Sequence, residues 1–105
     1  MNDVFVNGVQ YFVIIAEQKK KKKFLALLNE YEARGVEVVY AHGSMSPSAI
    51  AAAFGFEVEQ SKVLIACLLK NERAKALMEV LHKEYRFNEP NTGFAFSVPV
   101  EGMAF

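Results

Sequence analysis

Apolar residues along this chain fall into four runs that predict β-strands. Residues 10–16 and 58–70 contain nearly continuous stretches of apolar side chains, which is typical of strands buried on both faces. Residues 36–41 and 94–100 instead place apolar side chains at alternating positions, the period of a strand with two different faces. The pattern therefore predicts two central strands and two further strands of the same sheet.

Two segments between these runs have the helical period. Residues 24–34 carry an amphipathic stripe, and Gly35 is the expected stop after the last turn. Asn71 is the expected N-cap of a second helix that runs to about Tyr85. The two apolar stripes consist of Phe24, Leu27, Leu28 and Tyr31, and of Ala74, Leu77, Met78, Leu81 and Tyr85.

Local signals also bear on the ends of the sheet. Asn7-Gly8 stands between apolar residues and indicates a tight hairpin, although a frayed N-terminal arm explains the same residues equally well. Pro99 has no backbone N–H, so the last strand is expected at a sheet edge or at a bulge. Small residues such as Ala95 alternate with large ones there, which predicts a helix layer on one side of this strand and a close backbone on the other.

The order of the predicted elements is strand, helix, strand, strand, helix, strand. This order predicts an α+β fold of the ferredoxin-like βαββαβ plan, with a four-stranded antiparallel sheet and two helices on one face. The length of 105 residues fits a single domain over residues 1–105, with residues 42–60 as a loop insertion between strands two and three. The other sheet face is expected to be apolar and bare in a monomer, so we expect an oligomer that buries it.

Composition argues against several classes of protein. The formal net charge is zero, so the overall balance favours neither nucleic acid nor a membrane as a partner. The single cysteine, Cys67, excludes an internal disulfide, fits a reducing compartment and is expected to be a small buried hydrophobe. No signal peptide is visible and no segment approaches the ~20 apolar residues of a membrane span, so we expect a cytoplasmic protein without direct membrane insertion.

The sequence shows no motif for catalysis or metal binding. His42 and His82 are the only histidines, and no group of side chains has the spacing of metal ligands. The serines near residue 44 have no visible triad partners. We therefore expect no catalytic residue, no metal and no enzyme activity. The five consecutive lysines at residues 19–23 fit a solvated helix start better than an anion-binding or partner-binding patch, which is the alternative.

The closing segment carries a resemblance to a known family. Residues 92–101 read Thr-Gly-Phe-Ala-Phe-Ser-Val-Pro-Val-Glu. This segment is similar to the glycine-containing nucleotide loop and the final strand of the PII-like signalling proteins, relatives of the nitrogen regulatory protein P-II. The order of elements matches that family over nearly the whole chain, and residues 42–60 stand where the family carries its mobile partner-binding loop. The chain thus resembles a divergent PII-like signalling protein.

The resemblance implies a homotrimer that binds a small-molecule effector, such as an adenine nucleotide, in the cleft between subunits. The positions that match the family's ligand-binding residues are Gly43, Ser44, Asn91, Thr92 and Gly93. The lysine that follows the glycine in classical members is Phe94 here. The loop glutamine that helps to hold 2-oxoglutarate, the uridylylated tyrosine and the C-terminal basic residues have no counterpart. A member with another or weaker ligand is therefore expected.

Residues 42–60 are the expected signalling element. A short helix in this segment is marginal alone, so we expect it to dock on a regulated transporter or enzyme in one state and on its own trimer in the other. A permanently docked helix explains the same pattern equally well. The expected partner-binding side chains are Met45, Ile50, Phe54 and Phe56. The alternative function is an oligomeric interaction module, or a metal-linked trimer of the CutA type, without nucleotide sensing.

Overall fold

The computed structural model describes the chain at residues 3–40, 62–89 and 92–104, with side chains at 8–40, 62–89 and 92–102. Seven of the predicted site residues lie outside these ranges: Gly43, Ser44, Met45, Ile50, Phe54, Phe56 and Asn91. The described elements, in chain order, are β1 (Asp3–Glu17), the 3-10 turn η1 (Gln18–Lys20), α1 (Lys21–Glu30), β2 (Arg34–Tyr40), β3 (Lys62–Lys70), α3 (Asn71–Lys83) and β4 (Phe94–Ala104).

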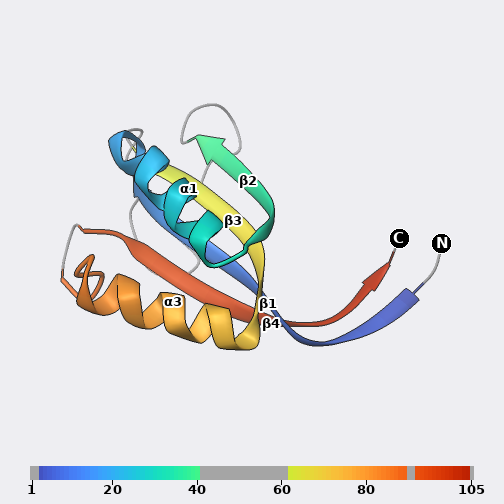
Figure 1. Ribbon diagram of the computed structural model, residues 1–105. Helices are drawn as coiled ribbons and strands as arrows, with labels where there is room; N and C mark the ends of the chain where they lie inside the picture. The colour runs from blue at the N-terminus through green and yellow to red at the C-terminus, as the bar shows by residue number, and fades with distance from the viewer. Residues whose placement is uncertain (1–2, 41–61, 90–91, 105) are drawn as a thin grey trace.

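The four strands form one antiparallel sheet in the order β2-β3-β1-β4. The two continuous apolar runs are the two central strands, because a strand with neighbours on both sides and cover on both faces exposes almost no side chain. Figure 1 shows α1 and α3 lying side by side over one face of this sheet. The predicted ferredoxin-like α+β fold, with two helices on one face, is confirmed.

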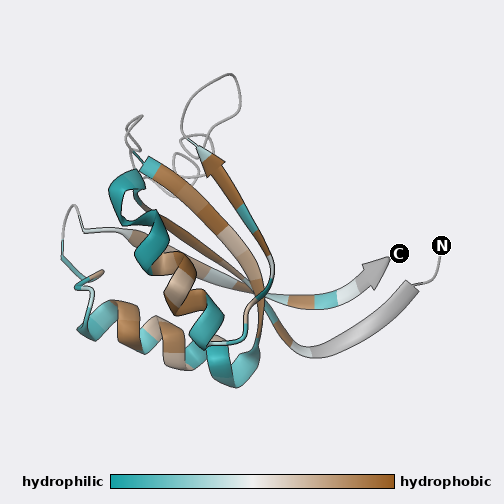
Figure 2. Ribbon diagram, turned by 45° about the horizontal axis from the view of Figure 1, so that its top comes forward, coloured by the Kyte–Doolittle hydropathy of each residue, from teal (hydrophilic) through white to brown (hydrophobic). Residues whose placement is uncertain are grey.

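The main core lies between the helices and the sheet. Alternate side chains of β1 and β3, among them Phe12, Ile14 and Ile65, are 0% exposed and pack against the apolar stripes of both helices. Figure 2 shows the hydrophobic stripe of each helix beside the hydrophobic central strands. The residues that the helices contribute are Phe24, Leu27 and Leu28 from α1, and Ala74, Leu77 and Leu81 from α3.

The helix-free face of the sheet is only partly bare, which corrects the expectation of a fully exposed apolar face. Its centre is a second buried cluster, in which Val13, Ile15, Leu64 and Ala66 are 1–3% exposed and the half-buried rings of Phe94 and Phe96 pack against them. The exposed apolar side chains lie at the sides of this cluster. They include Tyr11 and Val98, which are paired across β1 and β4, and Val39 on β2.

The hairpin predicted at Asn7-Gly8 is wrong, and so is a frayed arm. β1 runs unbroken through both residues, and Gly8 has a φ of 81°. The pairing with β4 shifts register between Phe5 and Val9, so Gly8 takes part in a β-bulge, where a glycine tolerates positive φ. β1 and β4 continue past the helices as a two-stranded ribbon that carries both termini (Figure 1).

The helix ends also differ from the predictions. α1 ends at Glu30, and Glu32, with a φ of 60°, makes the left-handed bend that was assigned to Gly35. Gly35 instead has its own positive φ of 58° inside β2, beside a register shift against β3. Asn71 is not an N-cap: it is the first residue of α3, and its side-chain oxygen accepts a hydrogen bond of 2.9 Å from Gln10 Nε2.

Pro99 is placed as predicted. It lies on β4, an edge strand of the sheet, opposite Gln10 of β1. The face of β4 that carries the small residue Ala95 lies toward the helices, while Phe94 and Phe96 lie on the other face. The small side chain lets the helical layer approach this edge strand closely.

Candidate functional site

The loop before β4 holds the two predicted ligand-binding residues that the structure describes, Thr92 and Gly93. The hydroxyl of Thr92 lies 2.6 Å from the carbonyl oxygen of Arg86 and 2.9 Å from that of Glu89, and donates its single proton to this pair. It therefore ties the start of β4 to the turn that follows α3, and in this geometry the hydroxyl oxygen can still accept a hydrogen bond.

Gly93 lies against an aromatic ring. A Cβ atom added at this position would come within 3.0 Å of three ring carbons of Phe87. The Phe87 ring packs edge-on against Phe24 of α1, with 5.7 Å between ring centroids. The glycine is thus needed for packing between this loop and the helical layer, a role that the sequence did not reveal because Phe87 belongs to a segment that reads as polar loop.

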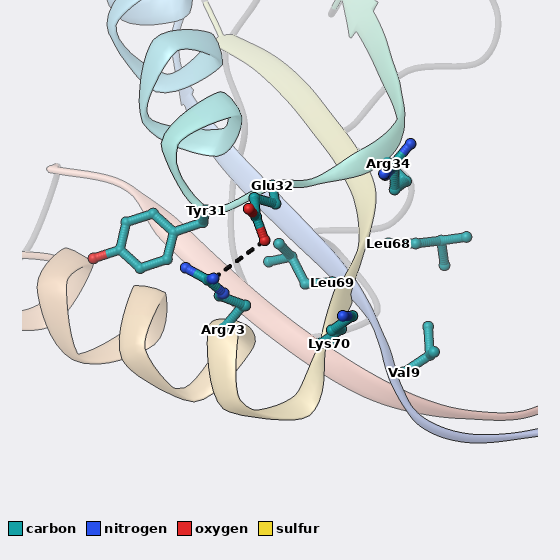
Figure 3. Close-up of a pocket in the computed structure, with 8 residues that line it drawn as sticks. All are labelled: Val9, Tyr31, Glu32, Arg34, Leu68, Leu69, Lys70 and Arg73. Carbon is teal, nitrogen blue, oxygen red and sulfur yellow. Dashed lines mark ion pairs between the residues drawn. The ribbon is translucent and has the colours of Figure 1, made fainter.

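A pocket of about 260 Å³ lies at the opposite end of the sheet, and sequence reasoning missed it. It forms where α1 ends, β2 begins and β3 passes into α3 (Figure 3). Its lining residues are Val9, Tyr31, Glu32, Arg34, Leu68, Leu69, Lys70 and Arg73. No local motif predicts it, because the lining comes from three separate stretches of the chain, residues 9, 31–34 and 68–73, that only the fold brings together.

The chemistry of this pocket is an apolar floor with a positive rim. Arg34, Lys70 and Arg73 supply three cations against the single carboxylate of Glu32. Arg73 Nη2 lies 3.1 Å from Glu32 Oε2, and Figure 3 shows the two side chains directed at each other. Both side chains are about half exposed, so this ion pair contributes about 0–1 kcal/mol to stability. The arrangement suits a ligand with a flat apolar part and an anionic group.

The pocket and the Thr92–Gly93 loop are far apart within one protomer. Lys70 of the pocket is the pairing partner of Val9 on β1, whereas Phe94, directly after the loop, is the pairing partner of Ile15 on the same strand. Six residues of extended strand at about 3.3 Å each separate the two positions by about 20 Å. The structure therefore does not bring the predicted loop residues and the cationic pocket together in a single chain.

The thiol of Cys67 lies in the core between the sheet and the helices. Burial raises the pKa of the Cys67 thiol to about 11, so the prediction of a buried hydrophobe is confirmed. Among the described residues, no group of His, Cys, Asp and Glu side chains could hold a metal ion. None of the described helices is long and apolar enough to span a membrane.

A chain of hydrogen-bonded polar side chains joins β1, β4 and α3. The Ser97 hydroxyl donates to Gln10 Oε1 at 2.8 Å, and Gln10 Nε2 donates to Asn71 Oδ1 at 2.9 Å. Gln10, Asn71 and Ser97 line an open cavity of about 290 Å³ together with Lys75. Because the hydrogen bonds of Gln10 are made within the protein, this group fixes the N-terminus of α3 on the sheet.

The element order and the sheet define a small α+β protein of the ferredoxin-like class. The family model of the nitrogen regulatory protein P-II matches residues 9–104, which is nearly the whole chain. The chain therefore belongs to the P-II family, and the resemblance seen in the sequence is confirmed.

Solved structures of PII-like proteins share the fold. The PII-like protein CPII from Thiomonas intermedia K12, bound to ADP, AMP and bicarbonate, is 17% identical with a TM-score of 0.66, and the match covers 99% of this chain and 100% of that one. A PII-like signalling protein from Thermus thermophilus is 18% identical with a TM-score of 0.67, covering 98% and 92%. No curated protein matches the sequence.

Proposed function

We propose that this protein is a trimeric signalling regulator that binds an adenine nucleotide between its subunits. The observation that carries the proposal is the pair of half-sites at opposite ends of the sheet. The Thr92–Gly93 loop and the cationic pocket lie about 20 Å apart in one protomer, as the strand register indicates. A cyclic assembly can bring the loop of one subunit beside the pocket of the next, because its interfaces join different surfaces of identical chains.

The exposed apolar side chains of the helix-free face support an assembly. Tyr11 is 41% exposed and Val98 46% exposed, and they are direct partners across β1 and β4. Both adjoin the buried cluster on the same face, so an interface here extends an existing apolar surface. We assign this face to contact between the three copies.

The chemistry of the pocket supports a nucleotide as the effector. Val9 and Leu68, which are half-buried and lie on the same face of the sheet, offer an apolar surface for a purine ring, and the cations of the rim offer charge to phosphates. Thr92 has acceptor capacity left at the other half-site, and Gly43, Ser44 and Asn91 are proposed to complete the cleft. The ADP and AMP bound to the Thiomonas protein, which shares the fold, point to the same class of ligand.

The regulatory output is assigned to the segment between β2 and β3. We propose that residues 42–60 contact a regulated transporter or enzyme through Met45, Ile50, Phe54 and Phe56, and that the nucleotide changes the balance between a free and a docked state of this segment. The whole chain then acts as one cytoplasmic regulatory domain without a reaction of its own.

A pair of matched substitutions tests the nucleotide site. Arg73→Gln removes a rim cation together with the ion pair to Glu32, whereas Glu32→Gln removes the same ion pair but keeps every cation. In calorimetric titrations with ADP, Arg73→Gln is expected to weaken binding about tenfold, the effect of losing one charged hydrogen bond. Glu32→Gln is expected to bind ADP at least as tightly as the unaltered protein.

Two outcomes contradict the assignment. Equal weakening by both substitutions would mean that only the ion pair matters, and unchanged binding in both would place the nucleotide elsewhere. A thermal-shift series with AMP, ADP, ATP, 2-oxoglutarate and bicarbonate identifies the preferred effector, since a ligand at about 100 times its Kd adds about 2.7 kcal/mol of stability.

A further inference from the structure

Six lysines gather at the end of the sheet where β1 ends and β3 begins. Five of them occupy η1 and the first turn of α1, and Lys62 opens β3 directly opposite Glu17. We call Lys19, Lys20, Lys21, Lys22, Lys23 and Lys62 the lysine cluster. A hydrogen bond from Lys19, together with the nearby charges of Lys62 and Lys20, lowers the pKa of Glu17, so positive charge converges here from two elements. Figure 2 shows this helix start as strongly hydrophilic.

The fold itself does not account for so many cations. Lys19 pairs with Glu17 at 3.2 Å, and Lys21 and Lys23 lie over the rings of Tyr40 and Tyr85. Within residues 3–40, 62–89 and 92–104, Lys20 and Lys22 have no acidic partner. The first turn of α1 contains no acidic residue, and the positive end of the helix dipole repels the cations that stand there. The cluster thus works against local stability, which points to an anion outside the molecule.

The composition of the cluster indicates the kind of anion. It contains no arginine, whose planar fork suits bidentate recognition, and consists of compact ammonium groups that act as point charges. The two rings at the cluster, Tyr40 and Tyr85, lie beneath ammonium groups, so in the described part of the chain no ring there is presented for stacking on nucleic-acid bases. A lipid surface needs neither a fork nor a ring, because it presents a dense plane of negative charge.

We propose that the lysine cluster docks this protein on an anionic lipid bilayer. Lys62 belongs to the cluster and Tyr40 contacts it, and these two residues flank the segment that we assign to partner binding. Docking therefore holds that segment close to a membrane, where a transporter is within reach. In a cyclic trimer the three clusters lie at one height along the symmetry axis, so a flat surface normal to that axis is at the same distance from each of them. The gain in affinity from three clusters on one surface rests on the proposed trimer, whereas docking through a single cluster does not.

Vesicle pelleting tests the proposal with matched variants. Lys20→Gln/Lys22→Gln removes two charges of the cluster, and the control, Lys75→Gln/Lys83→Gln, removes two exposed lysines of the other helix, α3. Each lysine near an anionic surface strengthens partitioning about fivefold, so the cluster variant is expected to bind phosphatidylserine-rich vesicles about 25-fold more weakly. The affinity of the control for these vesicles is expected to lie within about twofold of that of the unaltered protein. Added salt is expected to release both proteins from the vesicles.

Light scattering on the same samples reports the oligomeric state separately, so failure of the trimer and failure of docking are distinguishable. Equal binding to pure phosphatidylcholine vesicles, or equal loss in both variants, overturns the proposal. Cluster-dependent retention on duplex DNA without retention on vesicles overturns it as well, by assigning the cluster to nucleic acid. Because removing cations from a helix start does not destabilise the helix, the cluster variant should keep its melting temperature or raise it.

Discussion

Gly93→Ala adds a side chain to the loop before β4, where residue 93 has a φ of 157°; strain from that backbone is the same in every background, whereas the contact with Phe87 depends on the ring. The added Cβ would come within 3.0 Å of three ring carbons of Phe87, closer than any ordinary van der Waals contact. The ring cannot move freely, because it packs against Phe24 with 5.7 Å between centroids. Relief therefore costs either the aromatic pair, about 0.5–1.5 kcal/mol, or a backbone shift, for a total of about 1–3 kcal/mol.

Urea denaturation at one fixed protein concentration measures this cost, and a second substitution shows where it comes from. In a Phe87→Leu background the ring is gone, so Gly93→Ala should cost less than it does in the unaltered protein. The difference should be at least about 0.5 kcal/mol, because residues in contact have interaction energies of about 0.5–3 kcal/mol. If the alanine costs the same in both backgrounds, the contact with Phe87 does not explain the glycine. Loss of ligand binding in a Gly93 variant is consequently ambiguous unless its stability is measured alongside.

Three further predictions concern the sheet and the buried thiol. Val98→Asp places a carboxylate in the exposed apolar part of the helix-free face and should reduce the mass in light scattering from three chains to one, while Val98→Thr, of similar shape, should leave it unchanged. A trimeric Val98→Asp protein would remove this face from the interface. Cys67 has a pKa raised by burial to about 11, so the folded state keeps its proton where the unfolded state loses it, and stability should fall as pH rises from about 8.5 through 11. Native Cys67 should also resist iodoacetamide at pH 8, and rapid alkylation of the folded protein would contradict its burial.

Local and periodic signals were enough to predict the fold. The continuous runs around Phe12 and Ile65 identified the central strands, because strands buried on both faces must be apolar on both. The 3.6-residue stripes identified both helices, and Pro99 identified an edge strand. Each of these inferences depends on residues that are close together in the sequence.

Features that depend on pairing partners could not be predicted in the same way. Asn7-Gly8 has the composition of a hairpin turn, but pairing of residues 3–5 with β4 extends β1 through it and turns the glycine into part of a bulge. Glu32 takes the left-handed bend although Gly35 is the better residue for it, since Gly35 already has positive φ beside the register shift in β2. Tertiary pairing overrode local propensity in both places.

Of the two parts of the candidate site, sequence reasoning pointed to the Thr92–Gly93 loop but not to the cationic pocket. The resemblance located Thr92 and Gly93, and the structure adds that both also hold the loop in place. The cationic pocket was missed because Arg34 and Lys70 are far apart in the sequence, and only the junction of β2, β3 and α3 brings them together. The site proposed here combines two copies of the chain, and no single stretch of sequence carries the pattern of such a site.

Nucleotide affinity in a folded monomer tests most directly the central claim that the effector site forms between subunits. Val98 lies neither in the cationic pocket nor in the Thr92–Gly93 loop, so Val98→Asp leaves both half-sites chemically intact. Titration of ADP into this variant, once circular dichroism shows that it is folded and light scattering shows that it is monomeric, should give binding at least tenfold weaker than in the unaltered protein and in the Val98→Thr control. A folded monomer that binds ADP as tightly as the trimer would contradict the account.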